Sequence, residues 1–343
     1  MTKVPEILLI YTGGTIGMIK DYETNALKAF DFNHIYEKIP ELNQLNCNIE
    51  SISFKEPIDS SNMKTRYWVE IVEIIERNYD KKDGFVVLSG SDTMSYTSSA
   101  ISFMIENLNK PIIFTGSQLP IGDLRTDAKE NLITAIQIAA SRNKDGEPYI
   151  KEVGLYFEYK LYRANRTTKI NAEQFEAFTS PNYPPLAESG VHLKFDKNLI
   201  TNKKNKGSFK IRKNLENNIV ILKLFPGITE QVVKSILQIP IIKGVILETY
   251  GSGNAPTEKW FIKLLKEAIK KGIYIVDVTQ CIGGSVIMGH YDTSVQLEKI
   301  GLINGKDITT ESAVAKLMYL LGEKIIQKDF KTIFESPLRG EMM

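Results

Sequence analysis

The sequence has few of the residues that build disulfide frameworks and metal centres. Among its 343 residues there are two cysteines, Cys47 and Cys281, and three histidines, His34, His192 and His290. The cysteines lie far apart and form no Cys-x-x-Cys pair, which excludes a disulfide framework and indicates a reducing compartment. Each histidine stands alone in the sequence. We therefore predict neither a histidine-based metal site nor a Ser-His-Asp triad.

The sequence also lacks a strong net charge and any long apolar run. The formal net charge is +2, with 43% hydrophobic and 24% charged residues, which is the balance of a globular protein and gives no electrostatic reason to expect nucleic acid. No run approaches the roughly 20 apolar residues of a membrane span, and the first apolar run is too short for a signal peptide. We expect a soluble cytoplasmic protein that binds neither nucleic acid nor membrane.

Short apolar runs alternate with amphipathic segments along the chain. Strands are predicted at 7–11, 85–89, 111–115, 153–159, 218–224, 243–250 and 273–278. Helices are predicted at 65–78, 97–108, 126–140, 229–237, 256–272 and 311–325. Because the strands are continuously apolar and separated by helices, they indicate parallel sheets covered on both faces.

A basic segment separates the two halves of this pattern. Residues 194–213, KFDKNLITNKKNKGSFKIRK, contain many lysines and a single acid, and we interpret them as part of a solvated linker rather than a binding patch. The sequence therefore predicts an α/β fold with a larger N-terminal domain, whose mostly parallel sheet is flanked by helices, and a smaller C-terminal α/β domain. The predicted bounds are 1–195 for the first domain, 196–215 for the linker and 216–343 for the second domain.

Hydroxyls and glycines follow the first four predicted strands. The segments are TGGTIG, SGSDTMSYT, TGSQLPIGDLRTD and KLYRANRTTK, the second including Asp92 and the last ending at Lys169. Ligands bind open parallel sheets outside the carboxyl ends of the strands, so we expect these segments to meet at one edge.

The first of these loops, TGGTIG at 12–17, allows three interpretations. It matches neither the G-x-G-x-x-G fingerprint nor the P-loop, which disfavours phosphate binding. It can be a tight structural turn, since its glycines permit close backbone approach. It can also present Thr15 as a nucleophile for an acyl carbon, with neighbouring N–H groups as donors to the developing oxyanion.

A threonine nucleophile needs a base, and no histidine is placed to serve as one. Lys169 can serve in its neutral form, and Asp92 can orient its amine as a coupled partner. The alternatives are an ordinary surface lysine at 169 and a helix cap at Ser91 and Asp92.

The motif DSSNM also precedes a predicted helix. Ser60 and Ser61 can cap that helix, or they can hold a carboxylate together with N–H groups at the helix start. Both interpretations stay open at this point.

Several motifs occur together in a fixed order along the chain. They are YTGGTIGM, DSSNM, GFVVLSGSDTMSYTSSAISFM, KPIIFTGSQLP, LYRANRTTK, AFTSPNYPPLAESG, YGSGNAP and VTQC. In this order they resemble the bacterial-type L-asparaginases, most closely the cytoplasmic type I branch, from residue 6 to LRGE at 338–341. The resemblance implies hydrolysis of L-asparagine to L-aspartate and ammonia without metal or cofactor, by a homodimer or a homotetramer built as a dimer of dimers.

The resemblance also implies roles for individual residues. Thr15 is the implied nucleophile that forms an acyl-enzyme. The other implied catalytic residues are Ser91, Asp92 and Lys169. The implied substrate contacts are Ser60 and Ser61 at the α-carboxylate with Asp59 beside them, Asp92 at the α-amino group, Ser91, Ser117, Asn254 reaching into the partner subunit's site, and Tyr22 in a lid near residues 18–30.

Two positions depart from the family pattern. Ser91 stands where the family usually has threonine, which is stiffer at χ1, so we predict lower activity than in a Ser91→Thr variant. Glu248 stands where some type I enzymes use an arginine at a second, allosteric asparagine site. An acid cannot make that bidentate contact with a carboxylate, so conventional allostery is not expected. Cys281 keeps the pattern of that effector site, or is a small buried core residue.

Three other functions compete with asparagine hydrolysis. The first is an ammonia-releasing amidotransferase subunit, a class that carries an additional N-terminal domain, whereas the glycine loop here begins at residue 12. The second is a non-catalytic asparagine sensor, which would need no nucleophile. The third is a nucleotide-binding protein, suggested by the glycine loop alone.

Overall fold

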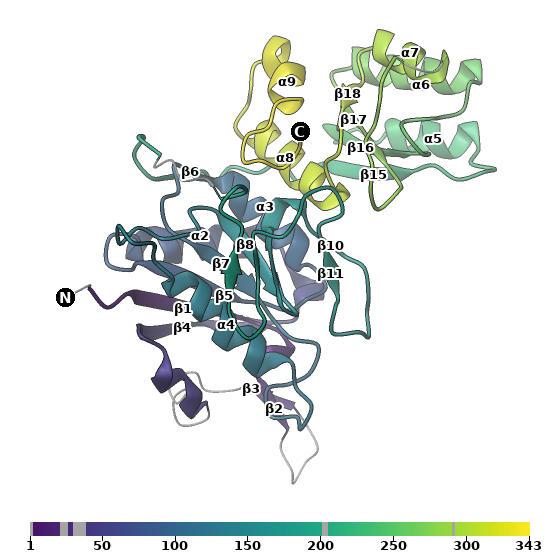
Figure 1. The fold of residues 1–343 in the computed structure, drawn as a ribbon. Coiled ribbons are helices and arrows are strands. Elements are labelled where there is room, and N and C mark those ends of the chain that lie inside the picture. The colour runs from purple at the N-terminus through teal and green to yellow at the C-terminus, as the bar shows by residue number, and fades with distance from the viewer. Residues whose placement is uncertain (1–2, 21–26, 30–38, 201–204, 290–291) are drawn as a thin grey trace. The chain divides into compact units, whose positions relative to one another are not determined.

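The computed structural model describes residues 3–20, 27–29, 39–200, 205–289 and 292–343. The chain divides into two units, Met1–Arg212 (unit 1) and Lys213–Met343 (unit 2), shown in Figure 1. The division falls within the segment predicted as a linker. Tyr22, the predicted lid residue, lies outside the described residues, as do His34 and His290.

Unit 1 is built on an eight-stranded mixed sheet with the order β13-β12-β9-β8-β7-β5-β1-β4. Its strands are β1 (Glu6–Gly13), β4 (Asn48–Ile58), β5 (Gly84–Leu88), β7 (Ile112–Thr115), β8 (Val153–Phe157), β9 (Lys160–Arg163), β12 (Ala187–Glu188) and β13 (Lys194–Phe195). The strands from β4 to β8 run parallel, and β9, β12 and β13 add an antiparallel edge. The predicted, mostly parallel sheet is confirmed.

The parallel register brings three strand ends together. Tyr11 of β1 lies opposite Leu88 of β5, and Leu88 lies opposite Thr115 of β7. The loops that follow these strands therefore leave the sheet side by side. Every residue of β5 and β7 is buried, as expected for the continuously apolar strands of a covered sheet.

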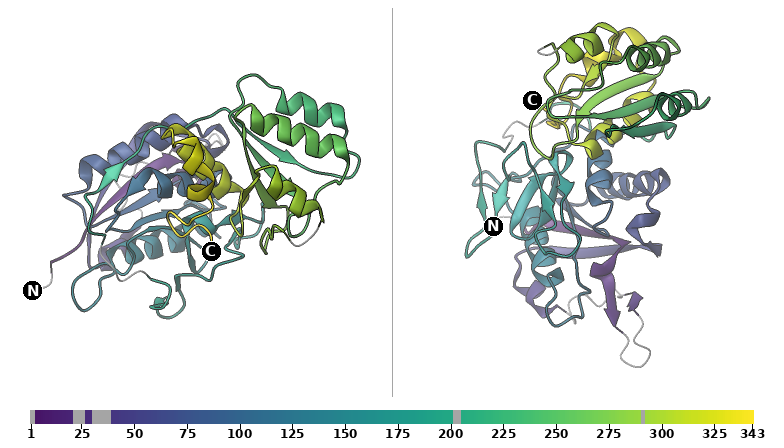
Figure 2. Two further views of the ribbon diagram at one scale, coloured as in Figure 1. Left: turned by 90° about the horizontal axis from the view of Figure 1, so that it is seen from above. Right: turned by 90° about the vertical axis from the view of Figure 1, so that its right-hand side faces the viewer.

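Helices cover both faces of this sheet, with α2 (Thr65–Asn78) and α3 (Met94–Met104) on one side and α4 (Ala128–Ala140) on the other (Figures 1 and 2). Side chains alternate along each strand, so one face of β1 packs in the core that α4 covers. Ile7 and Leu9 share this core with Leu132 and Ile136 of α4.

Unit 2 contains a four-stranded parallel sheet with the order β15-β16-β17-β18. Its strands are β15 (Ile219–Lys223), β16 (Gly244–Thr249), β17 (Tyr274–Thr279) and β18 (Ile303–Asn304). Its helices are α5 (Glu230–Leu237), α6 (Lys259–Lys270), α7 (Asp292–Lys299), α8 (Thr310–Gly322) and α9 (Gln327–Phe334). Near the end of the chain, Lys316 of α8 forms a fully buried ion pair with Glu341.

Short elements complete the described chain. The remaining two-residue and three-residue strands are β2 (Met18–Lys20), β3 (Leu27–Ala29), β6 (Ile105–Glu106), β10 (Thr168–Lys169), β11 (Phe178–Thr179) and β14 (Lys210–Ile211). The 3₁₀ helices are η1 (Thr15–Gly17), η3 (Pro40–Gln44), η4 (Ser60–Asn62) and η5 (Ala164–Arg166). The described part of the chain has no helix long and apolar enough to cross a bilayer.

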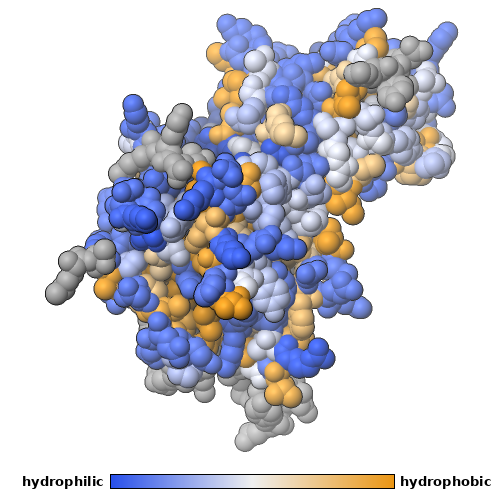
Figure 3. All heavy atoms as spheres, viewed as in Figure 1, coloured by the Kyte–Doolittle hydropathy of each residue, from blue (hydrophilic) through white to orange (hydrophobic). Residues whose placement is uncertain are grey.

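The structure differs from the sequence prediction in several places. The helix predicted at 97–108 runs from Met94 to Met104, because the next two residues pair with β14 instead. The segment after β8 is no simple loop, since it returns along the sheet as β9. The basic segment is not wholly solvated, because its Phe209 stacks on Tyr79 with ring centroids 3.6 Å apart. Hydrophilic residues cover much of the face in Figure 3, with smaller apolar groups between them.

Candidate active site

The glycine loop after β1 fits against two neighbouring strand ends. Gly13 has φ 132° and Gly14 has φ 86°, a region that favours glycine. A Cβ atom on Gly13 would lie 2.1 Å from the carbonyl oxygen of Ile58, and one on Gly14 would lie 2.3 Å from the backbone nitrogen of Gly90. Thr15 follows as the first residue of η1 and is half-buried. The loop is therefore a tight turn, and it places Thr15 just beyond the carboxyl end of β1.

The turn after β5 connects this loop to the end of β4. A Cβ atom on Gly90 would lie 2.5 Å from Ser60 Oγ, so the serine packs directly on the glycine backbone. The hydroxyl of Thr93 donates a hydrogen bond to the carbonyl oxygen of Ser60 at 2.8 Å. The segments after β1, β4 and β5 thus meet at one edge of the sheet, as the strand-end rule predicts.

Neither serine of DSSNM caps the predicted helix, because α2 has Lys64 at its N-cap position, and Asp59 caps the short 3₁₀ helix η4 instead. Its carboxylate accepts hydrogen bonds from both the backbone N–H and the hydroxyl of Ser61, each at 2.8 Å. The backbone hydrogen bond and then the hydroxyl lower the pKa of Asp59, which is exposed. Ser60 is buried and Ser61 exposed.

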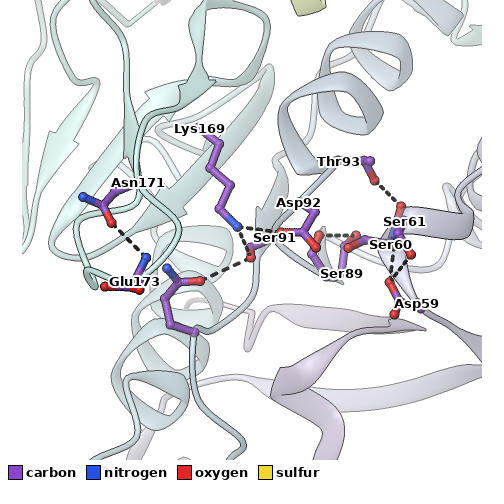
Figure 4. A network of polar contacts seen from close by, with 12 residues as sticks. Asp59, Ser60, Ser61, Ser89, Ser91, Asp92, Thr93, Lys169, Asn171 and Glu173 are labelled. Atoms are coloured by element: carbon purple, nitrogen blue, oxygen red, sulfur yellow. Dashed lines mark hydrogen bonds and ion pairs between the residues drawn. The ribbon is translucent and has the colours of Figure 1, made fainter.

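Lys169 lies between Ser91 and Asp92, as Figure 4 shows. Its Nζ atom is 2.9 Å from Ser91 Oγ and 2.8 Å from Asp92 Oδ1. The lysine side chain is 17% exposed and the aspartate side chain 66% exposed, so the lysine head is largely covered while the carboxylate faces solvent. Lys169 is therefore not an ordinary surface lysine. Thr93, rather than Ser91 or Asp92, is the N-cap residue of α3, and no side-chain capping bond forms there.

A buried contact positions the segment that carries Lys169. The hydroxyl oxygen of Thr167 lies 3.1 Å from Ser95 Oγ and 2.7 Å from the carbonyl oxygen of Ala164. Ser95 lies in the first turn of α3, the helix that begins just after Asp92. The start of α3 therefore positions both Asp92, which lies just before it, and the segment that carries Lys169.

The loop after β7 adds a residue that the sequence analysis missed. Gln118 Oε1 accepts a hydrogen bond from Ser91 Oγ at 3.4 Å. The neighbouring Ser117, which was predicted to contact substrate, is buried, and its hydroxyl donates to the carbonyl of Leu119 at 2.6 Å. Gln118 could not be found from its own sequence neighbourhood, because its contact with Ser91 joins two distant loops.

Family comparisons decide the relationship of the chain to known proteins. A family model described as "Asparaginase, N-terminal" matches residues 6–201, and one described as "Glutaminase/Asparaginase C-terminal domain" matches residues 218–334. The chain belongs to the asparaginase family. The predicted resemblance is confirmed, and so is the α/β fold with its separate C-terminal domain.

Individual relatives in the asparaginase family match over nearly the whole chain. L-asparaginase 1 of Escherichia coli K12 is 40% identical over 337 residues, which cover 98% of this chain and 97% of that protein. The crystal structure of L-asparaginase I from Vibrio cholerae is 39% identical, with a TM-score of 0.90 and coverage of 99% of both chains. A glutamyl-tRNA(Gln) amidotransferase subunit of Sulfolobus acidocaldarius is 32% identical over 98% of this chain and 75% of that protein.

The remaining predicted site residues lie in unit 2. Asn254 pairs with Tyr250 through two backbone hydrogen bonds of 2.8 Å, which close the YGSGN turn. Cys281 is exposed, so its interpretation as a buried core residue is wrong. Glu248 is buried; it accepts a hydrogen bond from Thr310 at 2.7 Å and pairs with Lys223 at 3.3 Å.

The acids, histidines and cysteines of the described ranges are dispersed. Those ranges contain no group of three or more histidine, cysteine, aspartate or glutamate side chains that could hold a metal ion.

Proposed function

We propose that this asparaginase-family protein hydrolyses L-asparagine to L-aspartate and ammonia, with Thr15 as the nucleophile. The observation that carries the proposal is the contact of one lysine with both Ser91 and Asp92, beside the glycine loop that presents Thr15. A nucleophilic alcohol needs such a proton acceptor nearby. The sequence relatives named L-asparaginase support the choice of substrate.

In the proposed first step, Thr15 Oγ attacks the side-chain amide carbon of asparagine. The hydroxyl proton leaves toward Ser91 and Lys169, a C–O bond forms, and the C–N bond then breaks as the leaving nitrogen takes up a proton. Ammonia departs and an aspartyl ester of Thr15 is left. In the second step water attacks this ester, the bond to Thr15 breaks, and aspartate is released.

The substrate's own charges would be met by groups on either side of the reacting carbon. Asp92, with its exposed carboxylate, would bind the α-amino group while it also contacts Lys169. Ser60 and Ser61 would contact the α-carboxylate, and the hydroxyl of Ser61 would leave Asp59 to do so. Asn254 would act in the site of a partner subunit, and we propose a homodimer or a dimer of dimers on this ground.

The relationship to an amidotransferase subunit supports a second candidate function. The chain shares 32% identity with a protein of that name, so its physiological role could be to release ammonia for a partner enzyme. Asparagine and glutamine differ by one methylene, worth about 1–3 kcal/mol in an apolar pocket. Preference for asparagine without any partner protein is expected of an asparaginase. Preference for glutamine, or dependence on a partner protein, is expected of an amidotransferase subunit.

The test is ammonia release from L-asparagine and from L-glutamine by the purified protein alone, with Thr15→Ala as the control. Saturable release from asparagine that is lost in Thr15→Ala supports the proposal. Preference for glutamine, or activity only with added partner proteins, favours the amidotransferase role. Binding of asparagine by calorimetry without ammonia release would show a sensor and would rule out the proposed hydrolysis.

A further inference from the structure

The hydroxyl of Ser91 has a second polar neighbour besides Lys169. Ser91 Oγ lies 2.9 Å from Lys169 Nζ on one side and 3.4 Å from Gln118 Oε1 on the other. Figure 4 shows Lys169 reaching toward Ser91. The serine hydroxyl is therefore shared between the candidate base and an amide.

The amide of Gln118 presents its oxygen to Ser91. Its Nε2 atom donates to the backbone carbonyl of Gln174 at 2.9 Å, and a carbonyl can only accept. The other end of the amide, which faces Ser91, is then the oxygen and can also only accept. A lysine ammonium carries donors alone. Ser91 therefore accepts from Lys169 and donates its own proton to Gln118.

Buried contacts fix the backbone of Gln118. Its N–H donates to Asp127 Oδ2 at 2.9 Å, and the N–H of Leu119 donates to Asp127 Oδ1 at 3.1 Å. Asp127 is 6% exposed, and its other neighbour Asn131 bonds both to its carboxylate and to the carbonyl of Gly116. The loop after β7 is thus tied at successive residues to the start of α4.

The carbonyl that receives the amide of Gln118 is also held in place. Asn171 Oδ1 accepts hydrogen bonds from the backbone N–H groups of Glu173 at 2.8 Å and Gln174 at 2.9 Å. This turn comes directly after β10, which carries Lys169. The segment 168–174 therefore carries Lys169 and also orients the Gln118 amide, and both side chains contact Ser91.

We propose that Gln118 is a positioning residue that holds Ser91 Oγ beside Lys169 Nζ until proton transfer. The inference rests on the proposed function. A separation of 3.4 Å is long for an O–H···O hydrogen bond. The bond is therefore weak enough for the hydroxyl to turn from Gln118 to the lysine once the lysine is neutral.

The proposed transfer conserves protons and charge. The O–H bond of Thr15 breaks as Ser91 Oγ takes its proton, while the original proton of Ser91 passes to Lys169 Nζ. The electron pair of the broken bond goes to the new C–O bond of the substrate. An ammonium forms at the lysine as negative charge develops on the substrate oxygen. The step therefore begins from a lysine that has already given one proton to solvent.

Serine depends on such an orienting partner more than threonine does. A threonine side chain is restricted about χ1 by its second Cβ substituent, whereas serine rotates more freely. Loss of the Gln118 acceptor should therefore matter less when residue 91 is threonine. A smaller loss with threonine at position 91 therefore indicates that Gln118 acts through the Ser91 hydroxyl. An equal loss indicates a general effect on the loop after β7.

The test is a double-mutant cycle of Gln118→Met and Ser91→Thr in the full chain, with kcat and KM measured for L-asparagine. Methionine has a similar length and no amide. In the parent, Gln118→Met should lower kcat by about 3- to 10-fold, the effect of one modest hydrogen bond, and change KM by less than about 2-fold. In the Ser91→Thr protein the loss of kcat should be at most about 2-fold. Gln137→Met, at an exposed position of α4, is the matched control and should leave kcat unchanged.

Each other outcome removes a defined part of the account. Equal losses of kcat in both backgrounds, or no loss in the parent, overturn the role of Gln118 and leave asparagine hydrolysis standing. A parent protein that releases no ammonia overturns the proposed function, and the positioning role with it.

Discussion

The hydroxyl oxygens of Ser95 and Thr167 lie 3.1 Å apart in the buried space between α3 and η5. Thr167 also lies 2.7 Å from the carbonyl of Ala164, and its single proton goes to that carbonyl, so Ser95 donates to Thr167. Lys169 follows two residues later. The contact therefore fixes the lysine relative to the helix that begins after Asp92.

Thr167→Val should damage both activity and stability. Valine has nearly the same shape but leaves a buried carbonyl and a buried hydroxyl without this partner, at a cost of about 1–3 kcal/mol in the free energy of unfolding. We expect kcat for asparagine to fall roughly 10-fold because the lysine is less well placed. Ser95→Ala keeps the bond from Thr167 to Ala164 and should lose less of both. Full kcat in Thr167→Val, with only a lower Tm, would show that the contact merely stabilises the fold.

Asp277 should make the stability of unit 2 depend on pH. It is fully buried in β17, and burial raises its pKa to about 7 even though Thr249 donates to its Oδ1 at 2.7 Å. Among the described residues its Oδ2 has no hydrogen-bond partner, and a Cβ atom on Gly253 would lie 3.4 Å from it. The folded protein keeps this proton up to about pH 7, whereas an unfolded aspartate loses it near pH 4. Stability should therefore fall as the pH rises from about 4 to about 7.

The Asp277→Asn variant isolates this effect. Asparagine can still accept from Thr249 but cannot ionise, so the variant should be more stable than the parent at pH 8, by up to about 4 kcal/mol, and little changed at pH 4.5. Urea unfolding at the two pH values measures the difference. A stability gain that is the same at both would show that Asp277 does not titrate in this range.

The ion pair of Lys316 and Glu341 should be necessary for folding of the C-terminal helices. Neither side chain is exposed, the backbone N–H groups of Leu338 and Arg339 also donate to Glu341, and burial lowers the pKa of Lys316. Glu341→Gln leaves the lysine charge without its counter-charge, which typically costs about 3–5 kcal/mol.

The matched control for this pair is an exposed one. Lys129 Nζ lies 3.7 Å from Glu41 Oε1, and each side chain is nearly half exposed. Glu41→Gln should therefore change the free energy of unfolding by less than about 1 kcal/mol. Thermal unfolding of both variants gives the comparison. Similar Tm values for Glu341→Gln and Glu41→Gln would contradict the importance of the buried pair.

Much of the site could be predicted because it lies at strand ends. The apolar runs of β1, β5 and β7 are easily recognised, and the parallel arrangement alone places their following loops together. Thr15 and Asp92 become candidates in this way. The ordered motifs then identified the family and the α/β fold of both units.

The path of the chain to Lys169 could not be predicted. β8 and β9 are joined by a tight hairpin turn whose residues, Glu158 and Tyr159, have φ values of 42° and 69°. Such turns normally contain asparagine or glycine, so the sequence carried no hairpin signal there. The apolar run therefore predicts one strand at 153–159 with a loop after it, whereas the structure has β8, the turn and β9.

Contacts between distant segments were also beyond sequence reasoning. The Gln118 amide is oriented by its hydrogen bond to the carbonyl of Gln174, which the sequence does not reveal. The stacking of Phe209 on Tyr79 likewise cannot be read from the composition of the basic segment. The missed edge strand β4 is different. Its residues alternate in exposure over part of its length, a pattern that the sequence NIESISF already contained.

The central claim is that Thr15 forms the covalent intermediate, and trapping that intermediate tests it most directly. The full-length protein would be mixed with L-asparagine, quenched in acid within the first turnover, and mapped by peptide mass spectrometry. We predict a transient aspartyl ester on the peptide that contains Thr15, absent from Thr15→Ala. An ester on Ser91 or another residue, or ammonia release with full activity in Thr15→Ala, would contradict the account.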